Sequence, residues 1–171
     1  MHLEVTAETA ANPEQVLALA GTNFSEQRAE VWTNVDARRL AVHERGATHV
    51  EVTEYATGIA WFAWERTRYD WSEPGLIKQV VLDSNVLQRG SWWELRVNPR
   101  AGGGSEVRMT FARRFRRSFN GAFAYLLNHL LGRRGWGWYL RSALKAVERA
   151  SPSSAASTRM AAAGSPKRMK P

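Results

Sequence analysis

Three side chains that can move protons or polarise a carbonyl group share an expected orientation in this chain of 171 residues. Side chains alternate between the two faces of a strand, which puts Glu65 and Tyr69 on one face of a strand-like segment and Arg113 on the inward face of another. A buried carboxylate needs a raised pKa or a cationic partner, and Arg113 is the candidate partner of Glu65. Glu65, Tyr69 and Arg113 are therefore candidate catalytic residues for general acid and base chemistry. A bulge or a rim position that leaves Glu65 and Arg113 in water stays open as the alternative.

Ser84 is a further polar candidate. It lies within Asp83-Ser84-Asn85, which interrupts an otherwise apolar run, and it shares a strand face with Val80 and Leu82. Its hydroxyl group either orients a ligand or caps a bulge in the strand, and both alternatives stay open.

Several kinds of catalytic and cofactor site are missing from the sequence. The chain has no cysteine, and metal-ligand spacing is absent among its four histidines, which are His2, His43, His49 and His129. It also has no serine nucleophile elbow. The glycine-rich residues 101–105 join two expected strands, which is typical of a hairpin loop and not of a phosphate cradle. We therefore expect no metal and no cofactor.

An antiparallel sheet is the element expected to position these side chains. Alternation of apolar and polar residues predicts a first strand over residues 3–7 and further strands near 39–45, 48–55, 59–69, 76–87, 91–98 and 105–115. Most connections are too short for crossover helices, so neighbouring strands are expected to pair antiparallel.

Helical spacing occurs on both sides of the region of strands. After the first strand, Asn12 predicts the start of one short helix, and Ser25 is the expected N-cap of a second. Apolar residues at helical spacing predict a long amphipathic helix over residues 118–149. An unbroken helix would point Arg133 inward, so we expect a kink or a change of register among the glycines of residues 132–137.

The formal net charge of +8 is distributed unevenly along the chain. It is −5 over residues 1–93, +9 over residues 94–150 and +4 over residues 151–171. The last segment is rich in Ser, Ala, Pro and Gly, so we expect a single domain at 1–150 followed by a disordered basic tail at 151–171. Because no apolar run is long enough to span a membrane and no secretory signal begins the chain, a cytoplasmic location is expected.

An arginine-rich run, Arg113-Arg114-Phe115-Arg116-Arg117, interleaves basic and aromatic residues in a way that can bind phosphate groups. The modest net charge of residues 1–150 favours a solvated face instead and disfavours nucleic acid as a partner. Contact with a membrane surface is left open.

Short segments of the chain resemble one known superfamily. They are Tyr69-Asp70-Trp71-Ser72-Glu73-Pro74-Gly75, Asp83-Ser84-Asn85, Trp93-Glu94-Leu95 and Gly103-Gly104-Ser105-Glu106-Val107. With the order of expected elements, they make residues 2–149 similar to the SRPBCC superfamily (START-like or Bet v 1-like), in its bacterial polyketide cyclase/dehydrase-like branch. The resemblance implies an α+β helix-grip fold. In that fold a curved seven-stranded antiparallel sheet wraps around a long C-terminal helix, and two short helices follow the first strand.

The resemblance also implies an apolar cavity between the sheet and the C-terminal helix. Candidate ligand-binding residues, taken from the expected inward faces, are Trp32, Trp61, Tyr69, Ser84, Trp93, Phe111, Phe115, Phe119, Phe123 and Leu127. For any one aromatic residue core packing is the simpler explanation, so the prediction depends on the set as a whole.

Three functions follow from these observations. The first is binding of a hydrophobic small molecule, such as a lipid, a polyketide or an aromatic metabolite, as a carrier or binding protein. The second is a polyketide cyclase or dehydratase that uses Glu65, Tyr69, Ser84 and Arg113. The third is a toxin-like or regulatory protein that acts through its arginine-rich surface, for which binding should depend steeply on salt.

Overall fold

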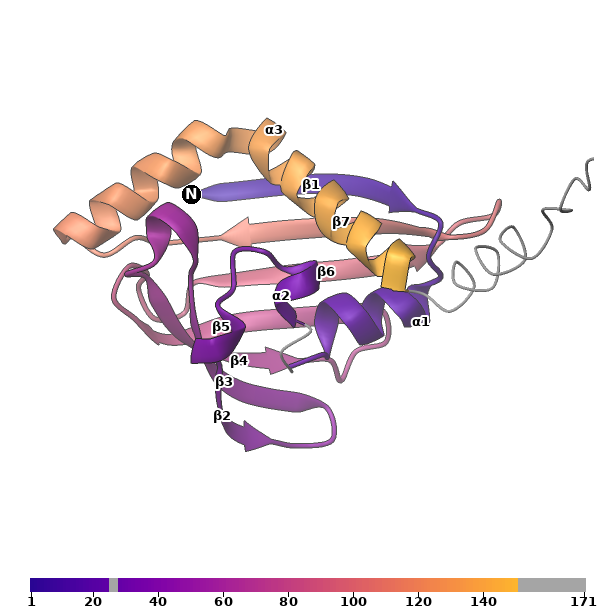
Figure 1. Ribbon diagram of the computed structural model, residues 1–171, viewed down its shortest axis with the longest axis horizontal. Coiled ribbons are helices and arrows are strands. Elements are labelled where there is room, and N and C mark those ends of the chain that lie inside the picture. Colours follow the sequence, from indigo (N-terminus) through magenta and orange to yellow (C-terminus); the bar gives the residue numbers. More distant parts are fainter. Residues whose placement is uncertain (25–27, 151–171) are drawn as a thin grey trace, which may run out of the picture.

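Seven antiparallel strands form one curved sheet, and a long helix crosses its concave face (Figure 1). The computed structural model describes residues 1–24 and 28–150. The strands are β1 (His2–Thr9), β2 (Ala41–Arg45), β3 (His49–Tyr55), β4 (Trp64–Asp70), β5 (Leu76–Ser84), β6 (Trp92–Pro99) and β7 (Ser105–Ala112). Their order in the sheet is β1-β7-β6-β5-β4-β3-β2. The predicted seven-stranded antiparallel sheet of a helix-grip fold is confirmed.

Short helical segments connect β1 to β2. They are α1 (Pro13–Val16), the π-helical turn η1 (Leu17–Gly21), α2 (Arg28–Val31) and the 3-10 turn η2 (Ala37–Arg39). The Asn12 side chain accepts a hydrogen bond from the Gln15 backbone N–H at 2.9 Å, and the Gln15 side chain accepts one from the Asn12 N–H at 3.0 Å. This capping box starts α1 where Asn12 predicts it. The expected N-cap Ser25 lies outside the described residues.

The long helix α3 (Phe119–Ala150) consists of two arms that meet at Gly132. Gly132 has φ 49° and ψ −163°, a backbone conformation open mainly to glycine, and this confirms the expected kink. Beyond the bend, the second arm packs on the sheet through Trp136, Leu140, Leu144 and Val147, whereas Arg133 is exposed. The break therefore keeps Arg133 out of the interior.

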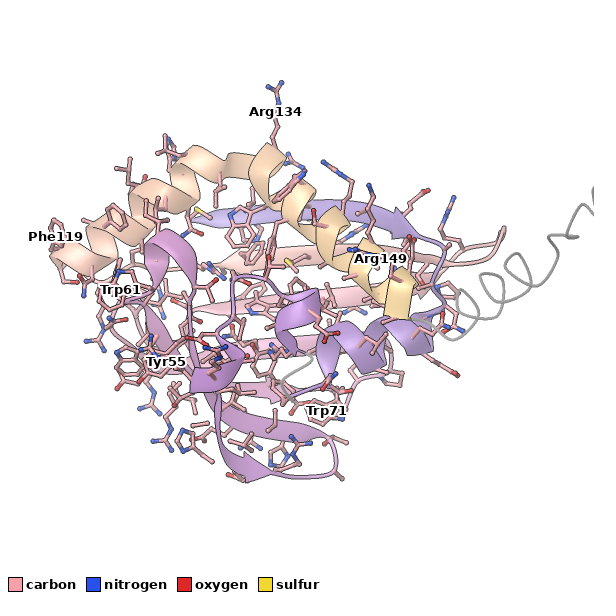
Figure 2. The ribbon with its side chains drawn as sticks, viewed as in Figure 1. Tyr55, Trp61, Trp71, Phe119, Arg134 and Arg149 are labelled. Carbon is pink, nitrogen blue, oxygen red and sulfur yellow. The ribbon has the colours of Figure 1, made fainter. Side chains whose placement is uncertain are left out.

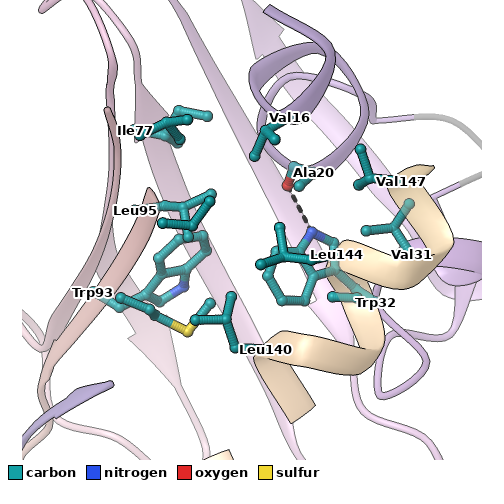
Figure 3. Close-up of a cluster of buried hydrophobic side chains, with 14 of the residues drawn as sticks. Val16, Ala20, Val31, Trp32, Ile77, Trp93, Leu95, Leu140, Leu144 and Val147 are labelled. Atoms are coloured by element: carbon teal, nitrogen blue, oxygen red, sulfur yellow. Dashed lines mark hydrogen bonds between the residues drawn. The ribbon is translucent and has the colours of Figure 1, made fainter. Parts of the chain in front are cut away.

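The main hydrophobic core lies between the second arm of α3, the short helices and the sheet (Figure 3). Leu140 and Leu144 face Leu95 and Trp93 across this layer. Trp32 from the segment after α2 donates its indole N–H to the Ala20 carbonyl oxygen at 2.6 Å, which fixes η1 against the core. The sheet and the second arm thus form a rigid frame around the polar side chains described below.

Four of the predicted strands are shorter in the structure by two or more residues, and the one expected near 39–45 starts only at Ala41, after the turn η2. The segment expected as a strand over 59–69 begins with the 3-10 turn η3 (Gly58–Ala60), and pairing starts only at Trp64. The Trp61 N–H bonds the Gly58 carbonyl, and Gly58 has φ +62°, so the chain is still turning at these residues. Likewise β5 ends at Ser84 and β7 at Ala112.

Candidate functional site

A pocket lies on the concave side of the sheet, between the strands, the segment after α2 and the second arm of α3. It has about 90 Å³ of open space and is partly open to solvent. Much of its wall is aromatic, from Trp32, Tyr55, Trp64, Tyr69, Trp93, Phe111, Trp136 and Tyr139. Tyr139 donates a hydrogen bond to the Asn34 side chain, which ties α3 to the segment after α2 at the pocket.

Arg28, Glu54 and Tyr69 form a closed polar cluster in the pocket wall. The Arg28 Nε lies 2.5 Å from Glu54 Oε1, and Arg28 Nη2 donates to the Tyr69 hydroxyl oxygen at 2.8 Å. The Tyr69 hydroxyl group in turn donates to Glu54 Oε2 at 2.6 Å. Arg28 is only 2% exposed and Glu54 11%, so the ion pair is shielded from water. A buried charge pair of this kind persists only because each partner is hydrogen-bonded.

The cluster shifts the pKa values of its members. Burial lowers the pKa of Arg28, but the charge of Glu54 and the hydrogen bonds more than offset this, so the pKa of Arg28 lies above its usual value. Burial and the neighbouring Glu54 carboxylate raise the pKa of Tyr69 well above its usual value. Both side chains therefore keep their protons, and Tyr69 acts as a hydrogen-bond donor at neutral pH.

Two buried hydrogen-bond donors in the pocket wall have no partner within the part of the chain that the structure describes. They are Arg28 Nη1 and the indole Nε1 of Trp136. A buried donor without an acceptor costs about 1 to 3 kcal/mol, and more when the group is charged. An acceptor oxygen from a ligand or from water would remove that cost, but both atoms have almost no accessible surface, so lining side chains must move to admit it.

Glu65 lies in the same pocket as a second carboxyl group. It accepts a hydrogen bond from Gln79 Nε2 at 3.2 Å. Burial raises the pKa of Glu65, and the opposing effects of Arg113 and Gln79 do not cancel this. Such a carboxyl group holds a proton more readily than a free glutamic acid, which is the property required of a general acid.

Arg113 reaches the pocket from the segment after β7. Its Nη1 donates to the Asn128 side-chain oxygen at 3.2 Å. Its guanidinium carbon lies 4.8 Å from the ring centroid of Phe111 and 5.1 Å from that of Trp136. These contacts hold a positive charge over the aromatic wall of the pocket.

The three candidate catalytic residues Glu65, Tyr69 and Arg113 all line this one pocket. Of the candidate ligand-binding residues, Trp32, Tyr69, Trp93 and Phe111 line it as well. The other six candidates are not among its lining residues: Trp61, Ser84, Phe115, Phe119, Phe123 and Leu127.

Local structure explains why these six lie elsewhere. Trp61 is 66% exposed because it precedes β4, so strand alternation does not apply to it. Ser84 accepts hydrogen bonds from the backbone N–H groups of Val86 and Leu87, at 3.0 and 3.1 Å, and therefore caps the irregular end of β5. Phe115 forms an isolated bridge with Leu87 and packs on a separate small core cluster.

The remaining three, Phe119, Phe123 and Leu127, lie on the first arm of α3. This arm turns other residues toward the body of the protein. Gly121 is buried, Ala124 packs on the small core cluster, and Asn128 bonds Arg113. Phe119, Phe123 and Leu127 were expected to face inward because the apolar stripe was extended across both arms of α3. The bend at Gly132 interrupts that stripe and leaves Phe119 85% exposed.

Sequence reasoning did not identify Arg28, Glu54 or Trp136 as site residues. A signal was present for Glu54, because it shares a strand face with the buried residues Val50 and Val52. Arg28 lies in a single helical turn that has no detectable period, and its partner is 26 positions away. Its role depends on a tertiary contact that local patterns do not contain.

Residues 1–24 and 28–150 contain neither a metal-binding cluster nor a membrane-spanning helix. No group of three or more His, Asp or Glu side chains there is arranged to hold a metal ion. No helix of those residues is long and apolar enough to cross a membrane.

Comparison with solved structures places the fold among known proteins. TTHA0849 from Thermus thermophilus superposes with a TM-score of 0.70 at 16% identity, over 88% of this chain and 99% of that one. The ZhuI aromatase/cyclase from Streptomyces sp. R1128 also gives 0.70 at 16% identity, over 87% and 94%. A START superfamily protein from Mycobacterium smegmatis gives 0.63 at 10% identity, over 86% and 94%. Because the sequence identities are this low, the superpositions show a shared fold and do not by themselves show a shared function.

Family membership rests on the sequence. No curated protein matches the chain. Residues 1–151 match the family described as "Polyketide cyclase / dehydrase and lipid transport", which spans every element described above. The chain therefore belongs to this family, within the SRPBCC superfamily that the sequence features resemble.

Proposed function

We propose that the protein binds a hydrophobic small molecule that carries an oxygen acceptor, and that this oxygen enters the pocket. The observation that carries the proposal is the buried Arg28 Nη1, which has no partner among the described residues and lies in an aromatic wall. Trp136 Nε1 is a second unsatisfied donor in the same wall. Family membership supports a hydrophobic ligand, and the donor pair adds that its inserted end is a carbonyl, carboxylate or similar group.

The size of the pocket limits how the ligand fits. About 90 Å³ of open space is less than the roughly 150 Å³ of an engineered cavity that holds benzene. A lipid or a polyketide therefore enters only in part, with the rest at the open mouth, unless lining side chains move. We propose that the oxygen-bearing end occupies the inner part and that the apolar remainder extends outward.

A matched pair of small ligands tests this proposal. Acetophenone and α-methylstyrene have nearly the same shape, but only acetophenone has an acceptor oxygen. Acetophenone should bind wild-type protein about tenfold more tightly, because it satisfies a buried charged donor. The two affinities are measured by isothermal titration calorimetry.

Substitutions at Arg28 and Trp136 test whether their two unsatisfied donors cause the preference for acetophenone. Arg28→Lys keeps the charge beside Glu54, and Trp136→Phe removes the indole N–H, so each should reduce the ratio of the two affinities. Trp138→Phe is the matched control, since Trp138 lies on the same arm of α3 but is 66% exposed. Equal affinity for both ligands in wild type, or no binding of either at millimolar concentration, would overturn the proposal.

A second candidate function is catalysis by a cyclase or dehydratase. The observation that favours it is Glu65, a carboxyl group with a raised pKa in the same pocket as Tyr69 and Arg113. In this proposal Glu65 donates its proton to a hydroxyl oxygen, which leaves as water, and the resulting carboxylate removes a proton from the adjacent carbon as the double bond forms. Arg113 would polarise the neighbouring carbonyl oxygen of the substrate, which makes that carbon easier to deprotonate.

Glu65→Gln separates the two functions. The amide keeps the shape of the side chain and cannot titrate. For an enzyme it should abolish turnover of a cyclisable polyketone and leave affinity nearly unchanged. For a binding protein it should change affinity alone, with no turnover in either form.

A further inference from the structure

The first arm of α3, residues 119–131, exposes its apolar side chains to solvent. Phe119 is 85% exposed, Leu130 73% and Leu126 51%. These positions are separated by seven and four residues, which brings them to one face of the helix. The opposite face, with Gly121, is the one that meets the rest of the protein. Most of the hydrophobic face of this arm, around Phe119, Leu126 and Leu130, therefore faces solvent in the part of the chain that the structure describes.

The neighbouring turn η3 enlarges the exposed apolar surface. Ile59 is 71% exposed and Trp61 66%. The ring of Trp61 lies 6.4 Å from that of Phe62, which lies 5.7 Å from that of Phe123 on the arm. Figure 2 shows Trp61 and Phe119 at the same end of the molecule. We call this combined surface, made of Ile59, Trp61, Phe119, Phe123, Leu126 and Leu130, the arm patch.

Basic residues border the arm patch at both ends of the arm. Residues 118–132 contain no Asp, Glu, Lys or Arg, whereas arginine pairs stand directly before and after, at 116–117 and 133–134. Across residues 107–147 there are nine Lys and Arg residues and no Asp or Glu. Arg117, Arg133 and Arg134 are exposed and make no ion pair within the described residues. Figure 2 shows Arg134 extending away from the protein at the bend.

The second arm continues this pattern on its outer face. Arg134, Trp138, Arg141 and Lys145 follow at helical spacing and all are exposed. An exposed tryptophan flanked by basic residues is typical of a surface that meets lipid headgroups, because the indole ring has an apolar body and a polar N–H.

We propose that the arm patch docks on an anionic lipid bilayer. Apolar side chains enter the headgroup region while the arginines at either end meet phosphate groups, as on helices that lie in the plane of a membrane surface. A second copy of the chain fits less well, since a symmetric contact would bring two sets of unpaired arginines together. The proposal concerns the outer face of α3 and does not depend on what occupies the pocket.

Vesicle co-sedimentation of the full chain tests this inference. The vesicles are phosphatidylcholine with 30 mol% phosphatidylglycerol, and pure phosphatidylcholine vesicles serve for comparison. Wild type should bind the anionic vesicles and lose affinity as salt rises. Phe119→Ser with Leu130→Ser should weaken binding about tenfold or more, because two exposed apolar anchors are lost. Arg133→Ala with Arg134→Ala should weaken it about ten- to thirtyfold.

Matched controls come from the far edge of the sheet. Val42→Ser removes an apolar side chain that is 45% exposed on β2, and Arg45→Ala removes an exposed arginine from the same strand. Both should leave vesicle binding unchanged. Binding that survives the arm-patch substitutions, or that falls equally with the controls, would overturn the inference. So would a dimer in analytical ultracentrifugation that Phe119→Ser with Leu130→Ser dissociates, in a protein that binds no vesicles.

Discussion

Glu54 and Glu65 lie directly opposite each other on β3 and β4, and both line the pocket. Residues paired in this way have Cβ atoms about 5 Å apart. Glu54 is held by Arg28 and Tyr69, whereas Glu65 accepts a hydrogen bond from the neutral Gln79. Within the described residues Glu65 has no ion-pair partner, so two adjacent carboxyl groups experience different surroundings. Carboxyl groups in contrasting surroundings are a common basis for dividing acid and base roles.

The raised pKa of Glu65 predicts how protein stability depends on pH. Folding favours the protonated form, so the contribution of Glu65 to stability is full below its usual pKa of 4.5 and is lost as pH rises through the higher folded-state pKa. Glu65→Gln removes this titration. The melting temperature of the variant relative to wild type should therefore be higher at about pH 8 than at about pH 5.

Differential scanning calorimetry at both pH values measures this difference. Glu30→Gln, which removes an exposed carboxyl group from α2, controls for the loss of one negative charge. A Glu65→Gln difference that is the same at both pH values would show that Glu65 has an ordinary pKa.

The hydroxyl group of Tyr69 is predicted to stabilise the fold. Tyr69→Phe removes the donor to Glu54 and the acceptor for Arg28, while the ring keeps its packing against Phe24. The free energy of unfolding should fall by about 2 to 3 kcal/mol, since both hydrogen bonds involve charged groups. Urea denaturation measures the change, and a loss below about 0.5 kcal/mol would mean that water replaces the hydroxyl group.

The Arg28–Glu54 pair predicts strongly non-additive substitutions. Arg28→Leu or Glu54→Leu alone leaves an uncompensated buried charge and should cost about 3 to 5 kcal/mol. The double variant removes both charges, so its cost should be well below the sum of the two. A double-mutant cycle in urea gives the coupling, and additive losses would contradict the shielded pair seen here.

Gly132 is predicted to set the bend in α3. At φ 49° and ψ −163° any other residue is strained, although a Cβ atom would meet no neighbour within 4 Å. Gly132→Ala should therefore destabilise the protein by about 1 to 3 kcal/mol. Gly102→Ala is the control, because Gly102 also has open space but no positive φ. Equal effects of the two substitutions in urea denaturation would argue against strain at the bend.

Sequence periodicity predicted the frame of the site better than its polar contents. Alternation correctly turned Glu65, Tyr69 and Phe111 toward one pocket, because a period of two holds wherever a strand is continuous. It was wrong for Trp61, since the turn at Gly58 delays the start of β4.

Helical periodicity in α3 was likewise reliable only where the helix is continuous. The stripe of the second arm was correctly expected to face the core, and Leu140 is fully buried. Extending the same stripe back across Gly132 placed Phe119 inward, whereas the bend turns it into solvent. The Arg28–Glu54 pair joins residues 26 positions apart, and no local period encodes such a contact.

The Trp136 indole N–H gives the most direct test of the pocket as a binding site for an oxygen-bearing ligand. Nitrogen-15 NMR of the eight tryptophan indole groups resolves each N–H, and the signal that Trp136→Phe removes identifies Trp136. Titration with acetophenone should move the Trp136 resonance downfield as the indole N–H donates a hydrogen bond to the ligand oxygen, while the signals of exposed Trp61 and Trp138 stay in place. A titration that moves only the exposed indole signals, or none, would contradict the proposed site.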